Sequence, residues 1–154
     1  MYKIITFNAN GIRSAARKGF FRWLAEQDAD AVCIQETKAQ EDQLKDDPMY
    51  YPLAHNYYHD AEKKGYSGVA LYLKHPPQTV RHGIGWAEID CEGRYLEAVY
   101  PTHSIISLYM HSGTSGDERQ QKKEAFMAKF APWLQARAQA RITKIGRASC
   151  RERV

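Results

Sequence analysis

The sequence has few cysteines and no long apolar run, and these absences exclude whole classes of protein. Only three cysteines occur among the 154 residues. Cys33, Cys91 and Cys150 lie far apart in the chain, which predicts free thiols in a reducing compartment rather than a disulfide framework. No stretch approaches the roughly 20 apolar residues that cross a bilayer, and the N-terminus lacks the features of a signal peptide. We therefore expect a cytoplasmic protein with no membrane partner.

Excess positive charge is also lacking over most of the chain. The formal net charge of +4 comes from 22 basic and 18 acidic residues. Residues 141–154 hold five of the basic residues and one of the acidic residues, which leaves 17 of each sign in residues 1–140. Because DNA binding without base readout depends mostly on neutralising phosphates, this balance argues against a non-catalytic DNA-binding module.

The C-terminal residues differ from the rest in pattern as well as in charge. Residues 145–154 read Ile-Gly-Arg-Ala-Ser-Cys-Arg-Glu-Arg-Val and follow neither the strand period nor the helix period. The string can be back-translated onto a commonly used sequencing-library adapter. We interpret residues 141–154 as a non-native basic tail that follows a domain in residues 1–140. A natural basic tail is the alternative, and the underlying nucleotide sequence decides between them.

The spacing of apolar residues predicts alternating strands and helices. The expected strands cover residues 2–8, 31–35, 57–60, 69–73, 79–83, 95–100 and 104–110. Helices are expected over residues 14–27 and 117–137, with Pro132 as a point where the second helix could kink. The first strand, helix and strand predict a parallel crossover, whereas the short later connections predict antiparallel neighbours. The simplest arrangement of these elements is a mixed sheet with helices on one face.

Polar residues follow two of the predicted strands where those strands end. Asn8 ends the first strand and Glu36 follows the second. A crossover would place the two side by side at the edge where open α/β sheets hold ligands. A carboxylate is a hard oxygen ligand suited to Mg²⁺ or Mn²⁺. A solvated acid at a strand end is the alternative interpretation of Glu36, and a sheet tyrosine is the simpler interpretation of Tyr109, whose hydroxyl could otherwise face a phosphate.

Motifs of other enzyme classes are absent, but five short motifs occur in an informative order. The sequence has no Walker-type loop, zinc-spaced Cys/His set or nucleophile elbow. Its five motifs are Lys-Ile-Ile-Thr-Phe-Asn-Ala-Asn-Gly-Ile-Arg at 3–13, Val-Cys-Ile-Gln-Glu-Thr-Lys at 32–38, Gly-Tyr-Ser-Gly-Val-Ala-Leu-Tyr at 65–72, Glu-Gly-Arg-Tyr at 92–95, and Leu-Tyr with a later glycine at 108–113. In this order they resemble the exonuclease III family of DNA-repair nucleases, relatives of the apurinic/apyrimidinic endonucleases.

The resemblance implies a fold, a reaction and a set of site residues. The implied fold is α/β (α+β), the N-terminal half of a four-layer sandwich of two mixed, largely antiparallel sheets flanked by helices. The implied reaction is Mg²⁺-dependent hydrolysis of duplex DNA at abasic sites and 3′ ends by a monomeric parent enzyme. Asn8 and Glu36 are implied to surround the metal, and Tyr109 to touch the scissile phosphate. Candidates for DNA contacts are Asn10, Arg94, Arg119 and Lys122.

Two departures from the family pattern set further expectations. Met110 and His111 stand where a proline is usual. The Gly-Asp-x-Asn and Ser-Asp-His motifs of the family do not occur, and the first would be expected after about Ile142. We therefore expect residues 1–140 to be the N-terminal part of a truncated phosphodiesterase domain, with an apolar sheet face left bare and no activity of its own. The alternative enzyme is a phosphohydrolase of the same superfamily that acts on lipid or inositol phosphates.

Overall fold

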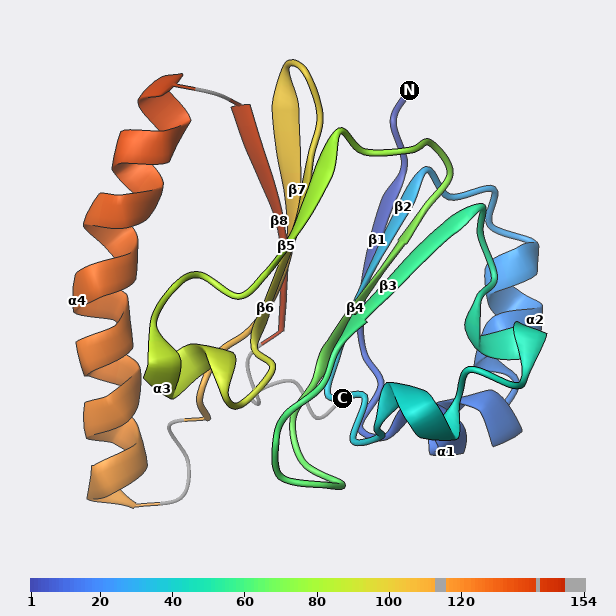
Figure 1. Ribbon diagram of the computed structural model, residues 1–154, viewed down its shortest axis with the longest axis horizontal. Helices are drawn as coiled ribbons and strands as arrows, with labels where there is room; N and C mark the ends of the chain where they lie inside the picture. The colour runs from blue at the N-terminus through green and yellow to red at the C-terminus, as the bar shows by residue number, and fades with distance from the viewer. Residues whose placement is uncertain (113–115, 141, 149–154) are drawn as a thin grey trace.

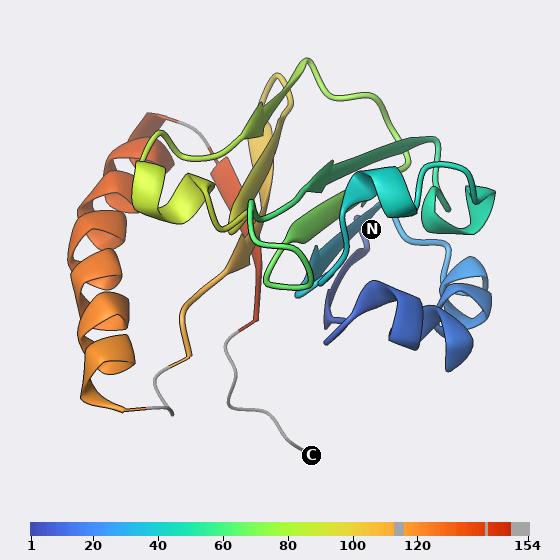
Figure 2. The same ribbon diagram turned by 60° about the horizontal axis from the view of Figure 1, so that its bottom comes forward.

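The strands form two sheets that pack face to face, with helices outside both of them. The computed structural model describes residues 1–112, 116–140 and 142–148. Gly113 of the fifth motif, Cys150 and the last six residues of the expected tail lie outside these ranges. Figure 1 shows four layers in the order helices, sheet, sheet, helices, and Figure 2 shows the same layers from a second direction. The four-layer expectation is therefore confirmed.

The first sheet, sheet A, contains four strands in the order β1-β2-β4-β3. Its strands are β1 (Ile4–Asn8), β2 (Ala31–Gln35), β3 (His55–His59) and β4 (Val69–Leu73). Strands β1 and β2 are parallel, as the expected crossover requires, and the other two pairings are antiparallel. Every residue of β2 and β4 is buried, because both strands lie in the middle of the sheet and are covered on both faces.

The second sheet, sheet B, repeats this plan with the order β5-β6-β7-β8. Its strands are β5 (Thr79–His82), β6 (Tyr95–Val99), β7 (His103–Tyr109) and β8 (Ile142–Ala148). Strand β8 pairs in parallel with β7, and the other two pairings are antiparallel. The apolar pattern did not predict β8, which lies entirely inside the segment expected to be a tail.

The inner faces of the two sheets bury one another. Apolar side chains of β2 and β4 pack against those of β6 and β7 in one cluster. The large hydrophobic residues exposed within the described ranges are Met1, Trp23 and Met49. The expected bare sheet face is therefore wrong, because the chain supplies strands to both sheets and each sheet already has a partner.

Short helices cover the outer face of sheet A. The expected helix over 14–27 is instead two helices, α1 (Ile12–Arg17) and α2 (Phe20–Ala25). Gly19 separates them because its backbone is left-handed, with φ of 90°. Two 3₁₀ turns, η1 (Glu41–Gln43) and η2 (Pro48–Tyr50), follow β2 in the chain.

Two helices cover the outer face of sheet B, so the expectation of helices on one face is wrong. They are α3 (Ala87–Asp90), too short to be expected from periodicity, and α4 (Asp117–Ala140). Helix α4 continues through Pro132 and packs Phe126 and Phe130 onto the sheet. Within the described parts of the chain, no helix combines the length and the apolarity needed to cross a bilayer.

Candidate functional site

The parallel pair β1–β2 brings Asn8 and Glu36 together at one end of sheet A. Asn8 lies opposite Gln35 in the register of the two strands, and Glu36 follows directly. The side-chain amide of Asn8 donates to Glu36 Oε1 over 2.9 Å. The expected adjacency of these two side chains is confirmed.

The backbone around Glu36 is left-handed at several residues that are not glycine. Glu36 has φ of 53° and Lys38 has φ of 49°, while Asn10 and Ser67 in the flanking loops have φ of 43° and 50°. Backbone hydrogen bonds hold these loops together: Gly11 N–H donates to the Glu36 carbonyl over 2.8 Å, and Lys38 N–H donates to the Ser67 carbonyl over 2.9 Å. Because such conformations are unfavourable for residues with a Cβ, their concentration here makes these loops a candidate functional site.

A lysine that sequence reasoning missed completes this group. The ammonium of Lys38 lies 3.3 Å from Glu36 Oε2 and donates to Asn10 Oδ1 over 2.6 Å. The side-chain oxygen Oδ1 of Asn8 is also occupied, since it accepts the backbone N–H of Asn10 over 2.9 Å. Asn8 therefore orients Glu36 in this structure. The available signal for Lys38 was its position two residues after Glu36 in the second motif, at 32–38.

Glu36 is a largely buried anion. Burial raises the pKa of its carboxyl, but hydrogen bonds from Asn8, Tyr109 and Lys38 together with the Lys38 charge outweigh it, so the pKa lies below its ordinary value. The oxygens of Glu36 and Asn10 converge on the Lys38 ammonium, which shows that this donor set suits a cation. The described residues contain no cluster of three or more His, Cys, Asp or Glu side chains that could hold a metal. Glu36 would thus need further ligands.

Tyr109 reaches this carboxylate from the other sheet. It ends β7, and its side-chain hydrogen bond to Glu36 helps to lower the pKa of that carboxyl. Its backbone N–H donates to the Arg94 carbonyl over 2.9 Å, which places it beside the start of β6. The structure therefore brings together Asn8, Asn10, Glu36 and Tyr109 from the expected set.

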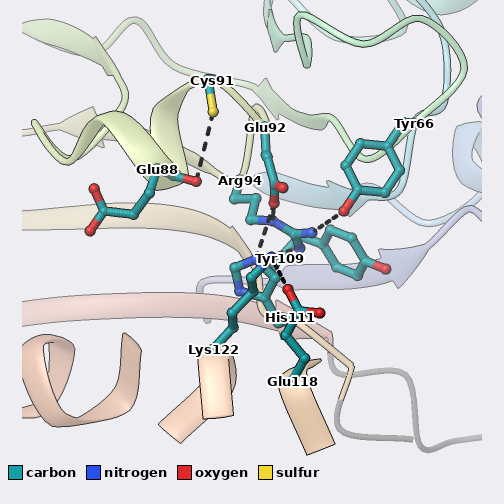
Figure 3. A network of polar contacts seen from close by, with 9 residues as sticks. All are labelled: Tyr66, Glu88, Cys91, Glu92, Arg94, Tyr109, His111, Glu118 and Lys122. Carbon is teal, nitrogen blue, oxygen red and sulfur yellow. Dashed lines mark hydrogen bonds and ion pairs between the residues drawn. The ribbon is translucent and has the colours of Figure 1, made fainter. Parts of the chain in front are cut away.

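The other three expected residues are placed differently. Arg94 is only 3% exposed, and its guanidinium bonds Glu92, Tyr66 and the Tyr109 carbonyl (Figure 3). Arg119 and Lys122 lie on the exposed side of the first turns of α4, where Lys122 pairs with Glu118 at 3.4 Å. Contact of any of the three with DNA stays a prediction.

Comparisons with known proteins agree on one family. Residues 5–142 match the Endonuclease/Exonuclease/phosphatase family. The chain is 39% identical over 131 residues to an exodeoxyribonuclease of Bacillus subtilis, a match that covers 82% of this chain and 51% of that protein. It is 34% identical over 134 residues to the DNA repair nuclease APEX1 of Danio rerio, covering 86% of this chain and 43% of that protein.

Solved structures show the same fold. An AP endonuclease from Archaeoglobus fulgidus aligns with a TM-score of 0.73 and 29% identity, covering 88% of this chain and 52% of that one. A 3′ phosphatase from Neisseria has the same TM-score at 22% identity, a likeness that shows the fold alone. The chain spans about half the length of the curated relatives it matches. It belongs to the endonuclease/exonuclease/phosphatase family.

Proposed function

We propose that the whole protein of which this chain is part is a DNA-repair nuclease that hydrolyses phosphodiesters of duplex DNA at abasic sites and 3′ ends. The observation that carries the proposal is the buried anion Glu36, held between an asparagine of one sheet and a tyrosine of the other. Relatives named as an exodeoxyribonuclease and a DNA repair nuclease support the substrate class.

Glu36 is the proposed metal ligand, with Mg²⁺ as the ion and Mn²⁺ able to replace it. Asn8 is proposed to share the metal surroundings by orienting the carboxylate and, after a turn of its amide, by offering its own oxygen. A bound divalent cation supplies charge stabilisation to the phosphoryl and leaving oxygens. Tyr109 is proposed to direct its hydroxyl at the scissile phosphate beside that carboxylate.

Contacts that hold the DNA are proposed at two places. Asn10 lies in the left-handed loop next to Glu36, where its side chain already accepts from a cation. Arg119 and Lys122 lie on the exposed side of the start of α4, where a phosphate could approach them from solvent.

The 154-residue chain is proposed to be inactive by itself. Residues 1–140 supply one acid to the site, and groups that act as a unit in catalysis cannot be removed singly without a loss of several orders of magnitude. Residues 141–154 are proposed to be non-native, which the nucleotide sequence of the parent locus would test. The parent enzyme is proposed to be a monomer in the cytoplasm, and the free thiols Cys33 and Cys91 support a reducing compartment.

A chimera tests the proposed reaction. Residues 1–140 would be joined to the remaining half of the Bacillus subtilis exodeoxyribonuclease and assayed on duplex DNA with a single abasic site. We expect Mg²⁺-dependent cleavage that Glu36→Gln lowers by at least about a hundredfold. The unmodified Bacillus protein serves as the positive control, and the 154-residue chain alone should cleave nothing.

The same chimera separates the alternatives. Hydrolysis of inositol phosphates or phospholipids without DNA cleavage would identify the other branch of phosphohydrolases. DNA binding without cleavage, unaltered by Glu36→Gln, would identify a non-catalytic module. Cleavage of DNA by the isolated chain would contradict its proposed inactivity.

A further inference from the structure

Arg94 connects three segments of the chain behind the proposed metal site. Arg94 directly precedes β6, and its guanidinium reaches both the loop that contains Tyr66 and Tyr109 at the end of β7 (Figure 3). We propose that Arg94 is a positioning residue: with its counter-ion Glu92 it holds the Tyr109 hydroxyl against Glu36. This inference rests on the proposed function of the Glu36 site and adds to it a residue that acts through another.

Arg94 fixes Tyr109 by its backbone and by its ring. One terminal nitrogen, Nη1, donates to the Tyr109 carbonyl over 3.2 Å. The guanidinium carbon lies 4.7 Å from the centroid of the Tyr109 ring, within the range of a cation–π contact. A tyrosine side chain has two rotatable torsions before its hydroxyl. A cation on the ring face restricts both torsions and leaves the hydroxyl able to bond Glu36.

The other terminal nitrogen holds the second tyrosine. Nη2 donates to the Tyr66 hydroxyl over 2.9 Å, and the guanidinium carbon lies 5.7 Å from the centroid of that ring. Next to Tyr66, Ser67 and Gly68 accept the backbone N–H groups of Lys38 and Thr37. Arg94 therefore also steadies the loop that flanks Glu36 on sheet A.

Glu92 compensates the charge of this buried cation. It accepts from Arg94 Nε and from His111 Nε2, the latter over 3.1 Å. Hydrogen bonds from His111 and Arg94 lower the pKa of the Glu92 carboxyl to about 2, although burial opposes them, so Glu92 stays charged at neutral pH. His111 comes two residues after Tyr109, so Glu92 also holds the chain segment that follows the tyrosine.

This arrangement favours positioning over direct binding of phosphate. Each of the three nitrogens of the Arg94 guanidinium donates to a protein acceptor, and the residue is 3% exposed. Turning the guanidinium toward a ligand would break these bonds and leave the Glu92 charge without one of its donors. A partly buried carboxylate that loses a charged donor is strongly disfavoured.

Terbium luminescence of the 154-residue chain tests the inference without any need for catalysis. Tb³⁺ prefers oxygen ligands, and it emits when a nearby tyrosine is excited. Titration of the wild-type chain should give an emission plateau that Tyr109→Phe largely removes and that Glu36→Gln abolishes. We expect Arg94→Met to lower the plateau to the Tyr109→Phe level and to leave the dissociation constant for Tb³⁺ unchanged. Glu92→Gln should cause a smaller loss of the same kind.

The control is Arg81→Met, which removes another ion-paired arginine of sheet B, 3.5 Å from Glu97, and should keep the full plateau. An unchanged plateau in Arg94→Met would overturn the positioning role. So would emission that does not depend on Tyr109. If the 154-residue chain binds no Tb³⁺ because Glu36 lacks further ligands, the same titrations are made with the chimera, in which absence of Tb³⁺ binding would overturn the proposed metal site. If circular dichroism shows Arg94→Met to be unfolded, Glu92→Gln and Arg94→Lys decide by the same criterion.

Discussion

Sheets A and B share a plan but contribute opposite things to the site. Each has four strands and a parallel pair at one edge. Sheet A supplies the amide of Asn8 at the end of β1 and a carboxylate on left-handed backbone, whereas sheet B supplies a tyrosine at the end of β7 and a buried guanidinium just before β6. The charge that would bind a metal and the groups that orient it thus come from different sheets. The site exists only while the two sheets are packed together.

Two glycines lie where the opposite sheet leaves no room for a Cβ. A Cβ on Gly93, before β6, would lie 2.6 Å from the oxygen of His59, which ends β3, and 2.5 Å from the carbonyl carbon of Asp60, which follows it. A Cβ on Gly146 of β8 would collide with the Cys33 side chain of β2. A Cβ at either point would force the neighbouring atoms to shift, so glycine permits this close approach of the sheets.

The largest expected effect on stability comes from disturbing the contact between the sheets at Gly93. Gly93→Ala adds a methyl group against backbone atoms and forces alanine into a φ of 56°. We expect a loss of about 3 kcal/mol in the free energy of unfolding, from left-handed strain plus overpacking. Urea unfolding measures it. Gly19→Ala is the matched control, since its φ is 90° but nothing lies within 4 Å. Equal losses in both variants would show that the contact between sheets is not what Gly93 protects.

The next largest effect tests the difference between the helices on the outer face of sheet A and those on the outer face of sheet B. The cover of sheet A is broken at Gly19, whereas α4 over sheet B runs through the exposed Pro132. Pro132→Ala restores a donor for the helix and should stabilise the chain by about 1–2 kcal/mol. Thermal unfolding followed by circular dichroism would detect the gain. A loss of stability would mean that the proline ring makes contacts that the helix depends on.

A smaller effect concerns the polar cluster of sheet B. The folded-state pKa of Glu92, about 2, lies below its ordinary value of 4.5. Its contribution is therefore complete above pH 4.5 and disappears as the pH falls toward 2. Glu92→Gln should cost about 1–2 kcal/mol at pH 7, allowing for partial exposure, and the difference from wild type should vanish near pH 2. Glu88→Gln, at an exposed ion pair, is the control. A difference that persists at pH 2 would contradict the linkage.

The smallest effect compares a thiol between the sheets with one outside them. Cys33 is fully buried, and burial raises the pKa of its thiol to about 12. Cys91 is partly exposed. A thiol-specific reagent at pH 8 should modify Cys91 in the folded chain and leave Cys33 unmodified until urea is added, as peptide mass mapping would show. Early modification of Cys33 would show that the sheets separate readily.

The apolar pattern located the strands of the fold, whereas its four layers followed only from the family resemblance. Alternation and β-branched residues predicted all seven strands from β1 to β7. Strand β8 was missed because Ile142–Ala148 has no clean period, and its place is fixed by pairing with β7. The break at Gly19 was missed because Phe20, Phe21 and Leu24 fit a single amphipathic helix equally well. Which sheet faces which is set by contacts between residues far apart in the chain, and no local pattern records them.

For the site, the sequence was informative about sheet A and weak for sheet B. The ends of two parallel strands predicted that Asn8 and Glu36 would meet, because strand order alone determines it. Glu92 and His111 are 19 residues apart and meet only through the antiparallel pairing of β6 with β7. The burial of Arg94 likewise follows from the packing of three segments. No pattern in the sequence predicts that these segments are in contact.

The left-handed residues around Glu36 lower the stability of the fold while they position the groups of the candidate site. Glycine at Lys38 or Ser67 would relax the backbone, where strain of about 1–2 kcal/mol per residue is expected. The same change at Lys38 would remove the ammonium that now faces the carboxylate. Selection for thermal resistance alone would therefore enrich glycine in these loops and erode the cation site. A screen of this chain should score metal binding and melting temperature together.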